Sequence, residues 1–188
     1  MDALLTTLLS VLVAEIGDRT QILAAALALR YNKNSAVLAG LACATLLNCA
    51  ISGIGGSVID GWISERPLKL FAGLAYIFAG SAMLMWRRKV DPLTGWKFPA
   101  FVTAFLGLFI LELGDKSQFI IAAQAARYEY WYMVPVGGFI GIMAATVPAV
   151  LLRERLAQVA PIKPMRWIGG ALLLGWGLNL ALQAFGLV

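Results

Sequence analysis

The chain has 188 residues, of which 61% are hydrophobic and 13% are charged, whereas about 25% of the residues in a soluble domain are charged. So few charges cannot cover a water-facing surface, which indicates a membrane protein rather than a soluble domain. The absence of histidine argues against zinc hydrolases, haem proteins and Ser-His-Asp enzymes, and the net charge of +5 is too scattered to indicate nucleic-acid binding.

Six segments are long and apolar enough to cross a membrane, since one helical span needs about 20 mostly apolar residues. They cover residues 4–29, 36–59, 68–86, 98–126, 133–152 and 167–187. None alternates apolar and polar residues as a strand of a membrane barrel does. The first segment lacks the basic start of a cleavable signal peptide, so we interpret it as a span. The sequence therefore predicts an all-α membrane protein with six transmembrane helices.

The two halves of the chain resemble each other at a spacing of 97 residues. Residues 15–21, EIGDRTQ, match residues 112–118, ELGDKSQ, and later prolines and glycines match at the same spacing. Each half holds three predicted spans, an odd number, so the second half must enter the membrane from the opposite side. We therefore expect two inverted three-helix repeats, 1–90 and 91–188, as in many secondary transporters.

Basic residues gather on one side of the predicted membrane. One group consists of Arg30, Lys33, Arg87, Arg88, Lys89, Lys97, Arg153, Arg155, Lys163 and Arg166, and the smaller group of Arg66, Lys69 and Arg127. Cytoplasmic loops carry the excess of Lys and Arg. This pattern predicts that the first, third and fifth loops lie in the cytoplasm and that both termini lie on the other side.

Six charged residues lie near the middle of the first and fourth predicted spans. They are Glu15, Asp18, Arg19, Glu112, Asp115 and Lys116. A charge at the bilayer centre costs about 2.5–3.5 kcal/mol to insert, so these residues must pair or line a wet cavity. In a continuous helix, Glu15 would pair with Arg19 and Glu112 with Lys116. Such pairs could merely fix helix packing, but an additional aspartate at the same position of both motifs favours a functional site.

Four carboxylates and two basic groups that meet at the bilayer centre would carry a net charge of −2, which one divalent cation neutralises. Oxygen ligands without histidine favour Mg²⁺, Ca²⁺ or Mn²⁺. Gln21 and Gln118 lie a turn further along and could add amide oxygens to the metal site. Protonation of the carboxylates would expel the metal, so the same residues could couple transport to protons.

Other polar and small residues in the spans allow two interpretations each. Gly17 and Gly114 either permit a break in the helix or allow close helix packing. Thr20 and Ser117 point away from the glutamates and suit helix contacts. A further group could complete the coordination of a metal or form ordinary interhelical hydrogen bonds. This group consists of Thr45, Asn48 and Thr146.

The doubled motif E-x-G-D-[KR]-[ST] resembles that of the Gdt-type family of manganese/calcium transporters, which includes bacterial manganese exporters of the MneA kind. The resemblance covers essentially the whole chain and implies a cation antiporter rather than an enzyme. By position, it implies a metal pathway formed by Glu15, Asp18, Glu112 and Asp115 and completed by the motif residues Arg19, Thr20, Lys116 and Ser117.

The same resemblance predicts the partners and the location of the protein. The partners are Mn²⁺ or Ca²⁺ as transported substrate, protons or Na⁺ as the counter-ion, and the lipid bilayer, and no permanently bound cofactor is expected. The sequence does not indicate an oligomeric state. The lack of a transit peptide and of a long central loop resembles bacterial members and predicts the bacterial inner membrane. Two alternatives stay open: a membrane enzyme that acts on lipid phosphates, and a passive divalent-cation channel.

Overall fold

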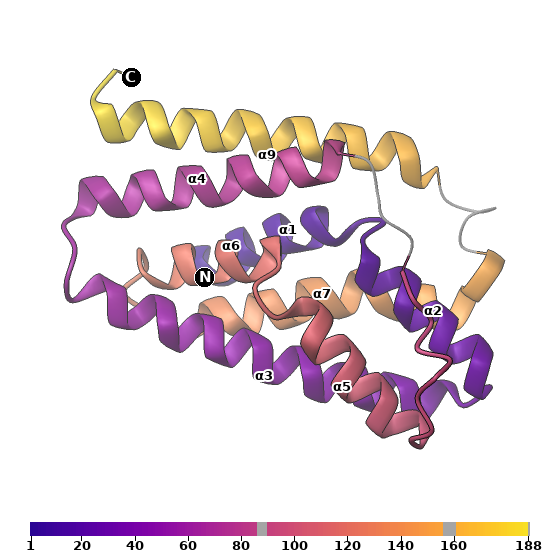
Figure 1. The fold of residues 1–188 in the computed structure, drawn as a ribbon. Coiled ribbons are helices and arrows are strands. Elements are labelled where there is room, and N and C mark those ends of the chain that lie inside the picture. The colour runs from indigo at the N-terminus through magenta and orange to yellow at the C-terminus, as the bar shows by residue number, and fades with distance from the viewer. Residues whose placement is uncertain (86–89, 156–160, 188) are drawn as a thin grey trace.

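The computed structural model describes residues 1–85, 90–155 and 161–187, and its elements there are helical. In chain order they are α1 (Asp2–Glu15), α2 (Arg19–Tyr31), α3 (Asn34–Asp60), α4 (Glu65–Leu84), α5 (Ala100–Glu112), α6 (Lys116–Ala125), α7 (Met133–Leu152), the short 3₁₀ helix η1 (Arg153–Arg155) and α9 (Ile162–Phe185) (Figure 1). The basic residues Arg87, Arg88 and Lys89 lie outside the described residues.

In the described part of the chain, four helices, α3, α4, α7 and α9, are long and apolar enough to cross a membrane. They correspond to the second, third, fifth and sixth predicted spans. Large apolar side chains cover their outward faces, for example Leu46, Ile54, Leu74, Phe78, Leu172 and Trp176. Apolar surface of this extent marks contact with lipid rather than with water, so the protein is a multi-pass membrane protein.

The first and fourth predicted spans are not continuous helices, and of the two interpretations of Gly17 and Gly114 the structure has the break in the helix. The segment 4–29 forms α1 and α2, and the segment 98–126 forms α5 and α6. The backbone turns at Gly17, with φ +64°, and at Gly114, with φ +74°. A residue with a Cβ atom would lose about 1–2 kcal/mol in this left-handed conformation, which explains why glycine occupies both breaks.

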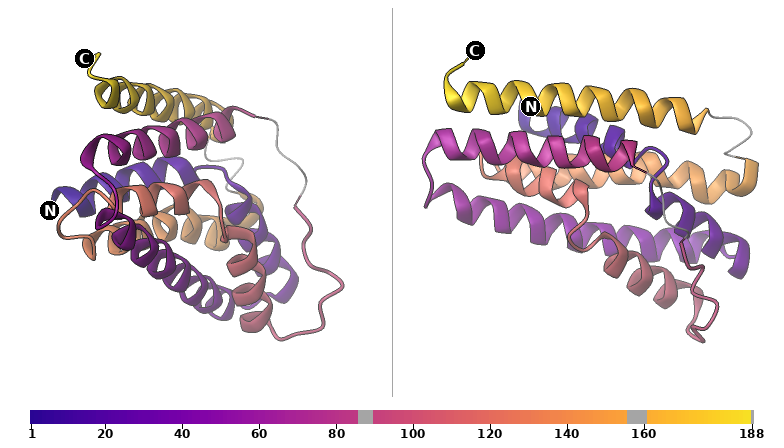
Figure 2. Two further views of the ribbon diagram at one scale, coloured as in Figure 1. Left: turned by 60° about the vertical axis from the view of Figure 1, so that its left-hand side comes forward. Right: turned by 45° about the horizontal axis from the view of Figure 1, so that its top comes forward.

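Helices α4 and α9 lie side by side and antiparallel as an outer layer in all views (Figures 1 and 2). Glycines bring their backbones together: a Cβ added at Gly73 would lie 2.9 Å from the oxygen of Gly177, and one at Gly80 would lie 2.7 Å from the oxygen of Gly170. Gly170 and Gly177 are the counterparts of Gly73 and Gly80 at the 97-residue spacing. Gly73 therefore contacts the counterpart of Gly80, and Gly80 contacts the counterpart of Gly73. We call such a pair of contacts reciprocal.

A second reciprocal contact joins α1 to α7 and α5 to α3. Gly137 on α7 packs against the backbone oxygen of Leu4, and Gly40 on α3 packs against the backbone oxygen of Phe101. These two contacts also correspond to each other at the spacing of 97 residues. A side chain at either glycine would push the helices apart, so these small residues set how closely the interrupted helices approach their neighbours.

The outer layer packs against only part of the interrupted helices. Helix α4 packs on α6, and α9 packs on α1. Helices α2 and α5 pack instead on each other and on α3, and α2 also packs on α7. A buried polar contact ties the first group together, because the hydroxyl of Tyr76 on α4 contacts Ser10 Oγ on α1 at 2.8 Å and accepts a hydrogen bond from Gln124 on α6.

Candidate cation site

Both sequence motifs lie where an interrupted helix breaks. Glu15 ends α1 and Asp18 directly precedes α2, while Glu112 ends α5 and Asp115 directly precedes α6. The motif glycines supply the positive φ angle in both breaks. A Cβ added at Gly17 would also clash with the side chain of Ile162, whereas a Cβ at Gly114 would meet no described atom within 4 Å. Gly114 is therefore required by the backbone conformation alone.

The ammonium group of Lys116 lies at the centre of the charged groups. Its Nζ atom is 3.0 Å from Asp18 Oδ1, 3.0 Å from Asp115 Oδ2 and 3.6 Å from Glu15 Oε1. The lysine side chain is only 3% exposed. These contacts join the two motifs, because Glu15 and Asp18 belong to the first and Lys116 to the second.

Arg19 has a different position, although it matches Lys116 in the repeat. Its Nη2 atom lies 3.1 Å from Asp115 Oδ1, and its side chain is 43% exposed. Among the described residues, no ion pair joins Glu15 to Arg19 or Glu112 to Lys116. The pairing predicted within each helix is wrong, because the break at each glycine removes the helical spacing on which it depended.

Three of the four predicted acidic ligands come together. One carboxylate oxygen each from Glu15, Asp18 and Asp115 lies within 4.8 Å of the other two. Oxygen atoms bound to one Ca²⁺ or Mg²⁺ ion lie about 2.0–2.6 Å from it, so three oxygens at this separation can hold a single ion after small side-chain movements. The geometry thus forms a candidate cation site from residues of both motifs.

The fourth acid, Glu112, lies beside this group. Its side chain is buried, and Oε2 lies 3.5 Å from Nδ2 of Asn48, which also donates to the backbone oxygen of Phe109. Glu112 Oε1 and both carboxylate oxygens of Glu15 are buried without a hydrogen-bond partner among the described residues. Buried oxygens without donors are costly, so Glu15 and Glu112 retain the capacity to bind a cation.

The two glutamines have protein partners. Gln21 accepts a hydrogen bond from the backbone N–H of Gly17 at 2.7 Å and donates one to the backbone oxygen of Ala145 at 2.7 Å. Gln118 accepts a hydrogen bond from Ser52 Oγ at 2.9 Å. Gln21 thus stabilises the break between α1 and α2 and fixes it to α7. Among the described residues, neither amide forms a hydrogen bond with a carboxylate.

The remaining predicted polar residues are buried. Thr20 and Ser117 open α2 and α6, and Thr45 and Thr146 lie on α3 and α7. The hydroxyl groups of Ser117, Thr45 and Thr146 have no hydrogen-bond partner among the described residues.

The sequence did not predict the contact of Tyr76 with Gln124. The one available signal was a polar amide, Gln124, in an apolar span.

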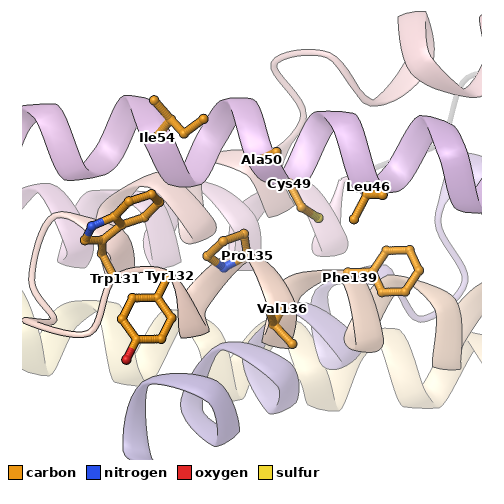
Figure 3. Close-up of a pocket in the computed structure, with 9 residues that line it drawn as sticks. All are labelled: Leu46, Cys49, Ala50, Ile54, Trp131, Tyr132, Pro135, Val136 and Phe139. Carbon is orange, nitrogen blue, oxygen red and sulfur yellow. The ribbon is translucent and has the colours of Figure 1, made fainter.

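The apolar pocket in Figure 3 lies between α3 and α7 and has a volume of about 450 Å³. Side chains such as Leu46, Trp131 and Phe139 line it, and its described lining contains no carboxylate or amide. It offers no ligand set for a hard cation. A smaller pocket of about 300 Å³ lies between α2, α5 and residues 90–96 and is lined in part by Arg19 and Asp91. This second pocket reaches the residue that pairs with Asp115.

Buried carboxylates between interrupted helices of a multi-pass membrane protein define a cation transport protein, because ionisable groups inside a membrane mark ion pathways. The family model described as "Divalent cation/proton antiporter GDT1" matches residues 3–91 and 100–187. The chain therefore belongs to the GDT1 family, which is a family of transporters and not of enzymes.

Individual relatives agree with this assignment. The chain is 33% identical over 181 residues to a Vibrio cholerae protein named "Putative manganese exporter", covering 93% of this chain and 88% of that protein. It is 30% identical to the rice (Oryza sativa) protein named "GDT1-like protein 3", over 95% of this chain and 73% of that one. It is 24% identical to the Saccharomyces cerevisiae "Divalent cation/proton antiporter GDT1", over 92% and 80% of the respective chains. No solved structure matches the chain.

Proposed function

We propose that this protein exports Mn²⁺ from the cytoplasm in exchange for protons, with Ca²⁺ as a second substrate. The observation that carries the proposal is the convergence of Glu15, Asp18 and Asp115, from both motifs, to within 4.8 Å. Glu112 is the fourth acid of the pathway and joins the site when the helices move. The family description supports divalent cation/proton exchange, and the name of the Vibrio relative supports manganese.

The transport cycle uses the chemistry of the carboxylates. A metal ion and protons compete for the same oxygens, so protonation on the outer side releases the metal and deprotonation on the inner side restores the site. The pocket that Arg19 and Asp91 line is the inner route to Asp115. Arg19 and Lys116 both bind carboxylates, which leaves neither free to hold a lipid phosphate, as the enzyme alternative requires.

We further propose that the chain crosses a bacterial inner membrane six times, as two inverted repeats of residues 1–90 and 91–188. In this arrangement α1 with α2, and α5 with α6, each form one interrupted crossing, and both termini lie outside the cytoplasm. The reciprocal contacts Gly73–Gly177 and Gly80–Gly170 support the arrangement, because a twofold relation makes each residue contact the counterpart of its partner.

The direct test is Mn²⁺ flux in proteoliposomes under an imposed pH gradient. We expect flux that follows the gradient in the wild type and falls at least about tenfold in Glu15→Gln and Asp115→Asn, because one ligand charge is lost from the site. Asp2→Asn, an exposed acid at the start of α1, is the matched control and should transport normally. Undiminished flux in both site variants would refute the site, and flux that ignores the pH gradient would indicate a passive channel.

A further inference from the structure

The ammonium group of Lys116 lies among the carboxylates that bind the metal in the proposed function. Lys116 Nζ contacts Asp18, Asp115 and Glu15 at 3.0, 3.0 and 3.6 Å. A metal bound to oxygens of these three groups would lie about 2.0–2.6 Å from each ligand atom. Two cations that share such a small site repel each other strongly. The ammonium and the metal therefore cannot both occupy it.

We propose that Lys116 is a tethered competitor of the transported ion. In the described conformation its ammonium occupies the carboxylate site when no metal is bound, and an incoming divalent cation must displace it. This inference rests on the proposed function, since it assumes that the site binds metal. It assigns Lys116 a role beyond charge pairing: the lysine lowers the affinity for the metal and thereby favours its release.

The structure also offers the displaced ammonium a second position. Glu112 precedes Lys116 by four residues, on the other side of the break at Gly114. Its side chain is 1% exposed, and its Oε1 atom has no hydrogen-bond partner among the described residues. A buried oxygen of this kind gains from a charged donor. Displacement by metal therefore moves the ammonium from the three-carboxylate site toward Glu112.

Arg19 provides the matched comparison. It occupies the equivalent motif position, yet it contacts one carboxylate, Asp115, and its side chain is 43% exposed where that of Lys116 is 3% exposed. Solvent screens an exposed charge far more than a buried one. The removal of Arg19 should therefore change metal affinity much less than the removal of Lys116.

The test is equilibrium binding of Mn²⁺ to the purified full chain in detergent, with free Mn²⁺ measured by electron paramagnetic resonance. We expect Lys116→Met to bind Mn²⁺ about tenfold more tightly than the wild type, or better, and Arg19→Met to change the Kd less than Lys116→Met does. If the wild type binds Mn²⁺ and Lys116→Met binds it equally or more weakly, the inference is overturned. A wild type that binds neither Mn²⁺ nor Ca²⁺ would instead overturn the proposed function.

Two further measurements cover the case in which Lys116→Met does not fold. Lys116→Arg keeps a positive charge at this position and should bind Mn²⁺ no more tightly than the wild type, so tighter binding by this variant would contradict displacement of the charge. In Lys116→Ala, added methylammonium should compete with Mn²⁺, because a free ammonium can then occupy the position of Nζ. The wild type should show no such competition, and its absence from the alanine variant would count against the proposal.

Discussion

Lys116 and Arg19 show that equivalent positions in a repeated sequence can have different surroundings. The sequence places both two residues after a motif glycine. In the structure Lys116 bridges two motifs in a buried position, while Arg19 lies at the rim of a pocket and holds one carboxylate. The partners of these buried ion pairs depend on how the two breaks lie relative to each other in the fold. The spacing of residues within one motif does not predict that arrangement.

The break at Gly114 gives a prediction at the residue scale. Gly114→Ala should destabilise the protein by about 1–2 kcal/mol, because alanine is strained at a φ of +74°. No described atom lies within 4 Å of the added Cβ, so the cost comes from the backbone alone. Thermal unfolding in detergent measures the change.

The control for this prediction is Gly114→Asn. Asparagine adopts the left-handed conformation more readily than alanine, so this variant should recover part of the lost stability despite its larger side chain. A variant with asparagine that is less stable than the one with alanine would show that space rather than backbone conformation determines the choice of glycine.

At the scale of helices, the length of the apolar segments located the predicted spans well but did not show which of them are continuous helices. Four of the six predicted segments contain the continuous helices α3, α4, α7 and α9 or most of each. The other two break at Gly17 and Gly114. A glycine in an apolar run suits a closely packed helix as well as a turn, so hydropathy could not decide between them. In the structure a hydrogen bond from the Gly17 N–H to Gln21 stabilises the first break.

The seam between α4 and α9 gives a prediction at this scale. Gly177→Ala should lower the thermal midpoint of unfolding, because a Cβ at this position would lie 2.7 Å from the backbone oxygen of Gly73. We expect a loss of about 1–3 kcal/mol, the usual effect of an overpacked contact.

Gly175→Ala is the control on the same helix. No described atom lies within 4 Å of a Cβ at Gly175, and alanine favours a helix by up to about 1 kcal/mol over glycine. This variant should be as stable as the wild type or more stable. Equal losses in both variants would mean that the seam does not require close backbone contact.

At the scale of the whole molecule, the basic residues and the fold agree on two distinct ends. The end of α2 and the starts of α3 and α5 lie at the end opposite the C-terminus (Figure 1). Arg30 there donates hydrogen bonds to the backbone oxygens of Leu93, Thr94 and Trp96, and Arg153 donates to Asn32 and Asn34. The arginines of the predicted cytoplasmic loops thus also hold neighbouring segments together through hydrogen bonds.

Labelling of single cysteines tests the proposed orientation. In a chain with Cys43→Ala and Cys49→Ala, an impermeant maleimide added to intact cells should label Trp62→Cys, which lies exposed between α3 and α4. It should label Thr94→Cys, exposed in the loop before α5, only after permeabilisation. Both variants should retain Mn²⁺ flux. The reverse labelling pattern would place the termini in the cytoplasm.

The uneven packing of the outer layer has a consequence for the conformational cycle of the protein. Because α4 and α9 pack on α6 and α1 but leave α2 and α5 to other partners, the two halves of the chain hold unlike conformations at one moment. If the halves exchange these conformations, the transport cycle has two end points. One is the described arrangement, and the other is the arrangement in which each half has the conformation that the other half has now. Arg19 would then become the sheltered cation and Lys116 the accessible one, so the solvent exposure of these two side chains would report which side of the membrane the pathway faces.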